Sequence, residues 1–165
     1  MYEAVVDAAV GLLNTYGVVI LLVVFALEGA LVGKLIPTRA LFVAAVLTVG
    51  SDAFGLASVF VAAVLGATLG QLVLFWLVRY ADADPENLPG ESAADRIEGW
   101  FDRWGLPAVA ISNTLPVARG SLTVPAAVSD EGPIRFSASS LVGSSVYAFG
   151  LVLVAAGIDI SLGLL

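Results

Sequence analysis

One short stretch decides how this chain must fold: Leu115-Pro116-Val117-Ala118-Arg119-Gly120-Ser121-Leu122-Thr123-Val124-Pro125. Arg119 is the one ionisable residue in the segment 106–128, and the sequence around it is apolar enough to lie in a membrane. A guanidinium keeps its proton even there, so it needs a partner. Arg119 therefore requires an anionic group from another apolar segment, and Glu28 is the candidate.

The composition is that of an integral membrane protein. Of the 165 residues, 59% are hydrophobic and 13% are charged, and the mean hydropathy is +1.00. The charged fraction is about half that of typical soluble domains. A soluble domain of this size could not bury so much apolar surface. We expect one membrane domain over residues 1–165, placed in the plasma membrane as a multi-pass protein.

The residue types that the chain contains, and those that it lacks, exclude several kinds of site and partner. The chain has no histidine and no cysteine, which excludes disulfides, thiolate sites and histidine relays. It has no basic patch, so we expect no nucleic acid partner. The net charge is −7 with a single lysine, Lys34, and acidic residues crowd the segment 80–104. Such a surface is typical of salt-loving organisms and predicts a halophilic archaeon; an ordinary acidic loop is the alternative.

Apolar segments alternate with breaks along the chain. Three segments are long enough to span a bilayer: residues 9–33, 53–78 and 136–158. Residues 40–50 follow a break at Pro37 and are too short to span. The segment 106–128 contains four helix breakers: Pro107, Pro116, Gly120 and Pro125. A short apolar piece beside such a break predicts a re-entrant hairpin.

The segment 80–104 contains the most polar part of the chain. Ser92 and Asp95 fit a capping box in its looser form. The helix that they open has four large apolar residues on one face: Ile97, Trp100, Phe101 and Trp104. We expect this amphipathic helix to lie in the membrane interface, with packing on its own domain as the alternative.

The two halves of the chain, residues 9–79 and 106–160, share one pattern. Each has a broken apolar block with a charge and a proline, followed by a long helix with a small-residue face. Paired broken segments of this kind predict a transport site at the bilayer midplane. We expect an all-α, polytopic membrane protein with about four spanning helices, two re-entrant helical hairpins related as an inverted repeat, and one interfacial amphipathic helix.

Four motifs follow one another between residues 25 and 157. They are Glu28-Gly29 ahead of Pro37; Gly66-Ala67-Thr68-Leu69-Gly70 ahead of Phe75 and Arg79; Pro116-Val117-Ala118-Arg119 ahead of Pro125-Ala126; and Phe136 ahead of Gly143 and Tyr147. The series resembles the DedA family, also called the SNARE-associated Golgi or VTT domain family. The resemblance implies two re-entrant hairpins that meet within the membrane. It also implies movement of lipids between leaflets, with a polyisoprenyl phosphate or a phospholipid as the cargo.

The chain departs from the family pattern at four places. Thr38-Arg39 stands where Gly and an acidic residue often follow the first proline, and Gln71 stands where an acidic residue is usual. Asn113 replaces an arginine of many bacterial members, and Ala127 replaces a glycine. These exchanges are either compensated, so that the charge of the site is kept, or they mark a change of substrate.

The candidate substrate- and ion-binding residues are Glu28, Arg39, Asn113 and Arg119. Glu28 could titrate a proton or gate the substrate, and the planar fork of Arg119 could bind a phosphate. Both could instead form a purely structural ion pair. Arg39 could extend the anion site or snorkel to a membrane face, and Asn113 could substitute for the missing arginine or simply interrupt a helix. The hairpins are expected to be shaped by Pro37, Pro116, Gly120 and Pro125.

The predicted function is a lipid flippase for a phosphate-bearing lipid, coupled to protons or Na⁺. The alternatives are an ion-coupled transporter of a small solute and a non-transporting membrane-homeostasis or assembly factor. We expect no enzyme, because nucleophiles of the His and Cys types are missing and Glu28 is the only acid in the broken apolar segments. No metal and no cofactor are expected. The expected partners are membrane lipids with a phosphate headgroup and further copies of the chain.

Overall fold

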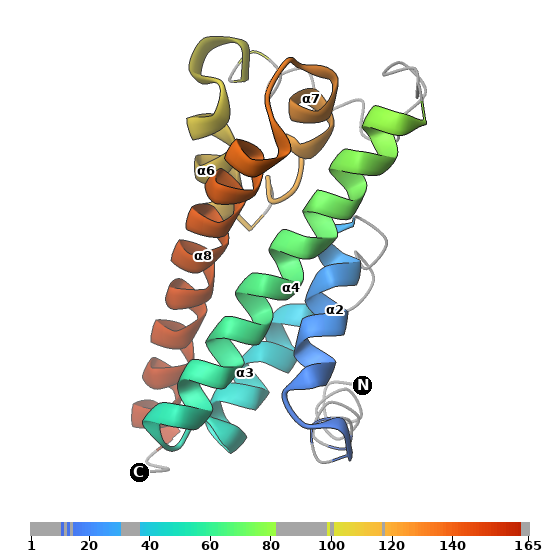
Figure 1. The fold of residues 1–165 in the computed structure, drawn as a ribbon. Helices are drawn as coiled ribbons and strands as arrows, with labels where there is room; N and C mark the ends of the chain where they lie inside the picture. Colours follow the sequence, from blue (N-terminus) through green and yellow to red (C-terminus); the bar gives the residue numbers. More distant parts are fainter. Residues whose placement is uncertain are drawn as a thin grey trace.

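The computed structural model describes residues 11, 13, 15–30, 37–81, 99, 101–116 and 118–162. These residues are helical apart from short turns, and they contain no strand (Figure 1). The helices, in chain order, are α2 (Val19–Gly29), α3 (Thr38–Val49), α4 (Ala53–Tyr80), α6 (Leu106–Thr114), α7 (Thr123–Val128) and α8 (Pro133–Leu162). The all-α prediction is confirmed.

Two long apolar helices form the frame of the molecule. α4 has 28 residues with a hydropathy of 2.1, and the apolar part of α8, Pro133–Ile158, has 26 residues with a hydropathy of 2.0. At about 1.5 Å per residue, each is roughly 40 Å long and can cross a bilayer. They pack against each other and run in opposite directions (Figure 1). These are two of the roughly four spans that we expected, and the other spans stay a prediction.

The outward faces of both long helices are apolar. Large exposed side chains recur every four residues along α4: Val61, Leu65, Leu69, Val73 and Leu77. α8 continues this surface with a second set: Val142, Val146, Phe149, Leu153 and Val154. An apolar surface of this extent would be unfavourable in water but matches the hydrocarbon core of a membrane. The fold is therefore that of an integral membrane protein.

Glycines let the short helix α2 pack directly on the backbone of α4. A Cβ atom at Gly66 would collide with the carbonyl oxygen of Leu22, and one at Gly70 would collide with that of Ala26. Such close approach needs small residues. The small-residue face that the sequence indicated on residues 53–78 is thus confirmed. In the second half, Gly143 of α8 lies equally close to the backbone of α6 at Ala110.

Prolines begin three of the short helices. Pro37 caps α3, whereas Pro107 lies in the first turn of α6 and Pro125 in the first turn of α7. A missing N–H costs little in a first turn, because that group has no partner within the helix. Pro107 and Pro125, two of the four helix breakers named above, thus each lie at the start of a short helix. The break falls between them, where Gly120 adopts a φ of 77°.

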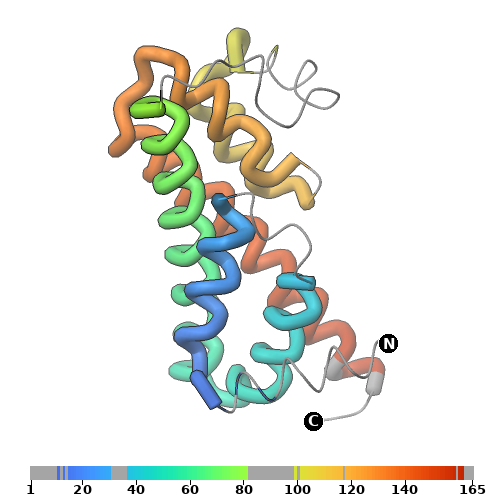
Figure 2. The backbone as a smooth tube through the Cα atoms, turned by 90° about the vertical axis from the view of Figure 1, so that its right-hand side faces the viewer, coloured from blue at the N-terminus to red at the C-terminus, as the bar shows by residue number. Residues whose placement is uncertain are grey.

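The two broken segments occupy opposite ends of the frame. α3 lies along the first half of α4 and α2 along its middle, whereas α6 and α7 lie near its other end (Figures 1 and 2). The turn between α6 and α7 reaches from its own end toward the middle of the molecule, where α2 ends and α3 begins. This arrangement brings the charged residues of the two halves together.

Most of the predicted interfacial helix, including Ile97 and Trp100, lies outside the described residues. The residues that are described at its end, 101–104, are helical. Phe101 is buried in the core cluster that contains Phe75 and Phe136, whereas Trp104 is exposed. The end of this segment therefore packs on its own domain through Phe101.

Candidate functional site

Glu28 and Arg119 meet at the centre of the structure. Glu28 is in the last turn of α2, and Arg119 is in the α6–α7 turn, immediately before Gly120. Arg119 Nη1 lies 3.6 Å from Glu28 Oε2, and the two side chains are 7% and 20% exposed. Among the described residues, neither of these two buried atoms has a hydrogen-bond partner. The two charges are thus close enough to attract each other, but the distance between Nη1 and Oε2 is too long for a hydrogen bond.

Aromatic rings hold the guanidinium of Arg119. Its Cζ atom lies 4.2 Å from the centroid of the Tyr147 ring and 5.5 Å from that of Phe25. Tyr147 comes from α8, and Phe25 lies one turn before Glu28 on α2. Rings at these distances attract a cation, and the attraction grows where water is excluded. The faces of the two rings therefore stabilise the charge of the guanidinium.

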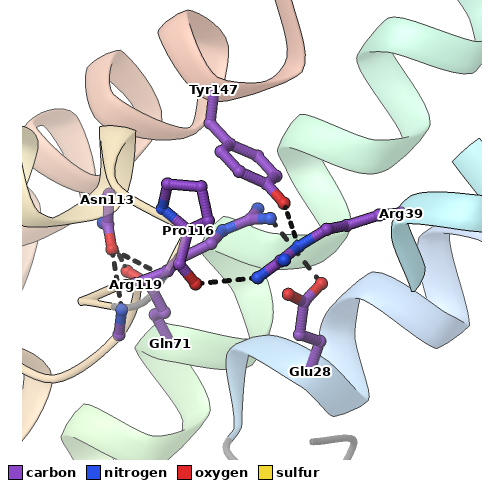
Figure 3. A network of polar contacts seen from close by, with 8 residues as sticks. Glu28, Arg39, Gln71, Asn113, Pro116, Arg119 and Tyr147 are labelled. Carbon is purple, nitrogen blue, oxygen red and sulfur yellow. Dashed lines mark hydrogen bonds and ion pairs between the residues drawn. The ribbon is translucent and has the colours of Figure 1, made fainter. Parts of the chain in front are cut away.

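Arg39 joins α3 to α8 and to the α6–α7 turn. It lies in the first turn of α3, and its Nε donates a hydrogen bond of 3.0 Å to the Tyr147 hydroxyl. Its Nη2 donates one of 3.0 Å to the carbonyl oxygen of Pro116 in the α6–α7 turn. Figure 3 shows the side chains of Arg39, Arg119 and Glu28 pointing toward one another. Arg39 thus points inward to the same site as Arg119, and it remains exposed.

Asn113 is paired with Gln71 beside this site. Asn113 Nδ2 donates to Gln71 Oε1 at 2.8 Å, and Gln71 Nε2 donates back to Asn113 Oδ1 at 3.0 Å. Both residues are 0% exposed. A buried amide costs little when its polar atoms are paired in this way. Asn113 is the last residue but one of α6.

The structure brings most of the predicted site residues together. One connected network (Figure 3) contains six of them: Glu28, Arg39, Arg119, Asn113, Pro116 and Gly120. Pro37 and Pro125 instead begin α3 and α7. Lys34 lies outside the described residues. The prolines thus set where the helices start, and the charged side chains make the contacts.

Three residues of the network were not singled out as site residues from the sequence: Phe25, Gln71 and Tyr147. Gln71 stood out as the one amide in the apolar helix α4, and Tyr147 as a hydroxyl-bearing ring in the middle of α8. A polar group inside a spanning helix needs a partner, which was the available signal. Phe25 carries no such signal, because it looks like any other core residue.

The chain matches a known protein family over most of its length. A model of the VTT domain matches residues 36–157. The chain belongs to the VTT domain family. The match covers α3, α4, α6, α7 and most of α8, together with the α6–α7 turn. The resemblance drawn from the four motifs is therefore confirmed.

Two relatives of known designation carry the same name. Undecaprenyl phosphate transporter A of Staphylococcus aureus is 25% identical over 163 residues, which cover 93% of this chain and 79% of that protein. Undecaprenyl phosphate transporter A of Bacillus subtilis is 23% identical over 109 residues, which cover 62% of this chain and 55% of that protein. No solved structure matches the chain.

Two departures from the family pattern fall on one contact. The pattern has an acidic residue at the position of Gln71 and, in many bacterial members, an arginine at that of Asn113. In this VTT protein the two side chains bond to each other. Two neutral amides therefore stand at these two positions, and they satisfy each other's polar atoms.

Proposed function

We propose that this VTT protein moves a phosphate-bearing lipid between the leaflets of the membrane, with Arg119 and Arg39 as the phosphate-binding residues. One observation carries the proposal. The guanidinium of Arg119 is buried, yet its Nη1 donor is unpaired among the described residues and its carboxylate partner is 3.6 Å away. A guanidinium in a dry site gains most from an anion that accepts short, paired hydrogen bonds, and a phosphate does so.

The balance of charge at the site also favours an anion. Among the described residues, two guanidiniums, those of Arg39 and Arg119, face one carboxylate, that of Glu28 (Figure 3). The neighbouring pair Gln71–Asn113 is neutral. Because charges interact strongly where water is excluded, the surplus positive charge attracts a phosphate headgroup. Arg39 is exposed and would meet the headgroup first, ahead of the buried Arg119.

Glu28 would act as the competitor of the phosphate. When the headgroup binds Arg119, Glu28 loses its partner and becomes an unpaired buried carboxylate, which is unfavourable unless it takes up a cation. A proton or Na⁺ could fill that role and couple transport to an ion gradient. Release of the ion would return Glu28 to Arg119 and expel the lipid. Access from either side would alternate as one hairpin moves against the other.

The relatives indicate the chemical class of the cargo. Both are named for the transport of undecaprenyl phosphate, a polyisoprenyl phosphate. We therefore favour a polyisoprenyl phosphate over a phospholipid. Such a role would place the protein in the plasma membrane as a multi-pass protein, and assembly into homo-oligomers is compatible with it.

The test is lipid translocation in proteoliposomes at matched amounts of folded protein. The variants are Arg119→Ala, Arg119→Lys and Glu28→Gln. The control is Arg135→Ala, because Arg135 is exposed at the start of α8 and its ion pair within the described part of the chain is with Glu131. We expect translocation of a polyisoprenyl phosphate but not of the matching polyisoprenol. Arg119→Ala should abolish it, Arg119→Lys should reduce it, and Arg135→Ala should leave it unchanged.

Two outcomes would contradict the proposal. Wild-type protein that moves neither polyisoprenyl phosphate nor phospholipid faster than empty liposomes would favour transport of a small solute. Equal activity of folded Arg119→Ala and wild type would mean that the Glu28–Arg119 pair has only a structural role.

A further inference from the structure

A buried cluster of neutral groups lies beside the arginine site. Its members are Gln71 of α4, Asn113 of α6, Ser140 of α8 and the backbone N–H of Gly120. Besides the reciprocal amide bonds, Gly120 N donates to Asn113 Oδ1 at 3.0 Å, and the Ser140 hydroxyl donates to Gln71 Oε1 at 2.7 Å. The three side chains are 0% exposed. One cluster thus ties three helices and the α6–α7 turn together.

The oxygen of Asn113 has a double role. The same atom accepts from Gly120 N and from Gln71 Nε2, so it closes the α6–α7 turn and attaches that turn to α4. Gly120 follows Arg119 directly and has a φ of 77°, a conformation that few other residues adopt. The bond to Gly120 N therefore fixes the backbone next to the Cα atom from which the guanidinium projects.

Close packing keeps Asn113 in its place. A Cβ atom on Gly143 of α8 would lie 2.6 Å from the Cβ of Asn113, so α8 approaches the base of this side chain directly. With α8 on one side and Gln71 on the other, the amide has little freedom to rotate. The direction in which it presents its oxygen to Gly120 is thereby fixed.

We propose that Gln71 and Asn113 form a clamp that positions Arg119 for its anion. Because both members are neutral, the clamp holds the turn without competing with Glu28 or with a phosphate for the guanidinium. Gln71 and Asn113 are positioning residues; they act through Arg119 and need not touch the cargo. The transport consequence rests on the proposed function, whereas the clamp itself can be tested without any transport.

The first experiment measures how firmly the turn is held. The chain has no cysteine, so single cysteines can report on it. Thr123→Cys places a thiol three residues after Gly120 at a 0% exposed position, and Ala45→Cys on α3 is an equally buried control. Labelling by a membrane-permeant maleimide is compared with and without the clamp-deleting pair Gln71→Met and Asn113→Leu. We expect labelling at position 123 to accelerate at least tenfold while labelling at position 45 stays the same.

Either of two results would overturn the clamp. Unchanged labelling at position 123 would show that the turn does not depend on Gln71 and Asn113. Equal acceleration at both positions would show a general loosening of the fold and no specific hold on the turn. Neither result depends on whether the protein transports a lipid.

The second experiment connects the clamp to the cargo. In folded, reconstituted protein, Asn113→Leu should raise the half-saturating concentration of a polyisoprenyl phosphate about tenfold, with the maximal rate nearly unchanged. A merely structural role would instead lower the maximal rate, because fewer molecules would be active, and would leave half-saturation in place. That second pattern, or no change in either quantity, would overturn the positioning role.

Discussion

Glu28 and Arg119, which come from opposite halves of the chain, form an ion pair of 3.6 Å in the interior of the protein. Each is the charge that the other needs, since a lone charge inside a membrane is costly. The pair is also incomplete, because Nη1 of Arg119 and Oε2 of Glu28 have no hydrogen bond within the described residues. The pair therefore links the end of α2 to the α6–α7 turn, and it leaves one donor and one acceptor without a hydrogen bond among the described residues.

Removal of one member of this pair should cost more stability than removal of both. Arg119→Leu leaves Glu28 without its counter-charge and should lower the free energy of unfolding by about 3 kcal/mol. The double variant Glu28→Gln, Arg119→Leu should lie within about 1 kcal/mol of the wild type, because no charge is left unpaired. Unfolding in detergent micelles measures both. A double variant as unstable as Arg119→Leu would contradict the expectation.

Substitutions at Tyr147 should distinguish the contribution of its ring to transport from that of its hydroxyl. Tyr147→Phe keeps the ring 4.2 Å from Arg119 but loses the hydrogen bond to Arg39. A hydrogen bond contributes roughly 1 kcal/mol, so this loss should reduce lipid translocation about fivefold. Tyr147→Leu also removes the cation–π contact, worth about another 1–2 kcal/mol, and should reduce translocation by a further factor of roughly 5 to 30. Tyr80→Leu, at the exposed end of α4, is the control and should have no effect. Equal losses for the two Tyr147 variants would rule out a role for the ring.

A methyl group at the α2–α4 contact should not be tolerated. Gly70→Ala places a Cβ against the backbone of Ala26 and should cost about 2 kcal/mol or more, because backbone cannot move aside as a side chain can. Gly150→Ala on α8 is the matched control, since nothing lies within 4 Å of its added Cβ. It should be neutral or stabilising by up to about 1 kcal/mol. Thermal unfolding midpoints of the two variants compare them, and similar midpoints would show that α2 does not pack as described.

Arg79 should anchor the short helix α7. Its Nη2 donates to the carbonyl of Ser129 at 2.6 Å and its Nη1 to that of Glu131 at 2.9 Å, at the end of α7. Its guanidinium also lies 5.0 Å from the ring centroid of Phe75. Arg79→Ala should therefore lower the free energy of unfolding by about 2 kcal/mol. Arg135→Ala removes only an exposed pair and should change it by less than about 0.5 kcal/mol. A ranking in the opposite order would refute the anchoring role.

The sequence by itself determined the class of fold and the places where helices stop. Hydropathy and segment length are local properties, so the long helices α4 and α8 and the short α3 could be predicted within a few residues. The start of α4 is local in the same sense: Asp52 is a residue type that favours the N-cap, and its carboxylate accepts a bond from Gly55 N at 2.6 Å. The requirement that Arg119 have a partner also followed from composition alone, because burial of a charge is unfavourable wherever it occurs.

Only the tertiary structure decided which polar groups meet. The departures at Gln71 and Asn113 were visible separately, but that they bond to each other depends on how α6 packs on α8 and brings Asn113 to Gln71 of α4. The same holds for Arg39, which could have pointed to either side of the membrane until its bonds to Tyr147 and Pro116 were known. Pro107 and Pro125 stand in the first turns of α6 and α7, which the sequence did not reveal, because a proline's effect depends on where its helix begins. Helix starts and long-range pairs are set by packing between segments far apart in the chain, which no local pattern records.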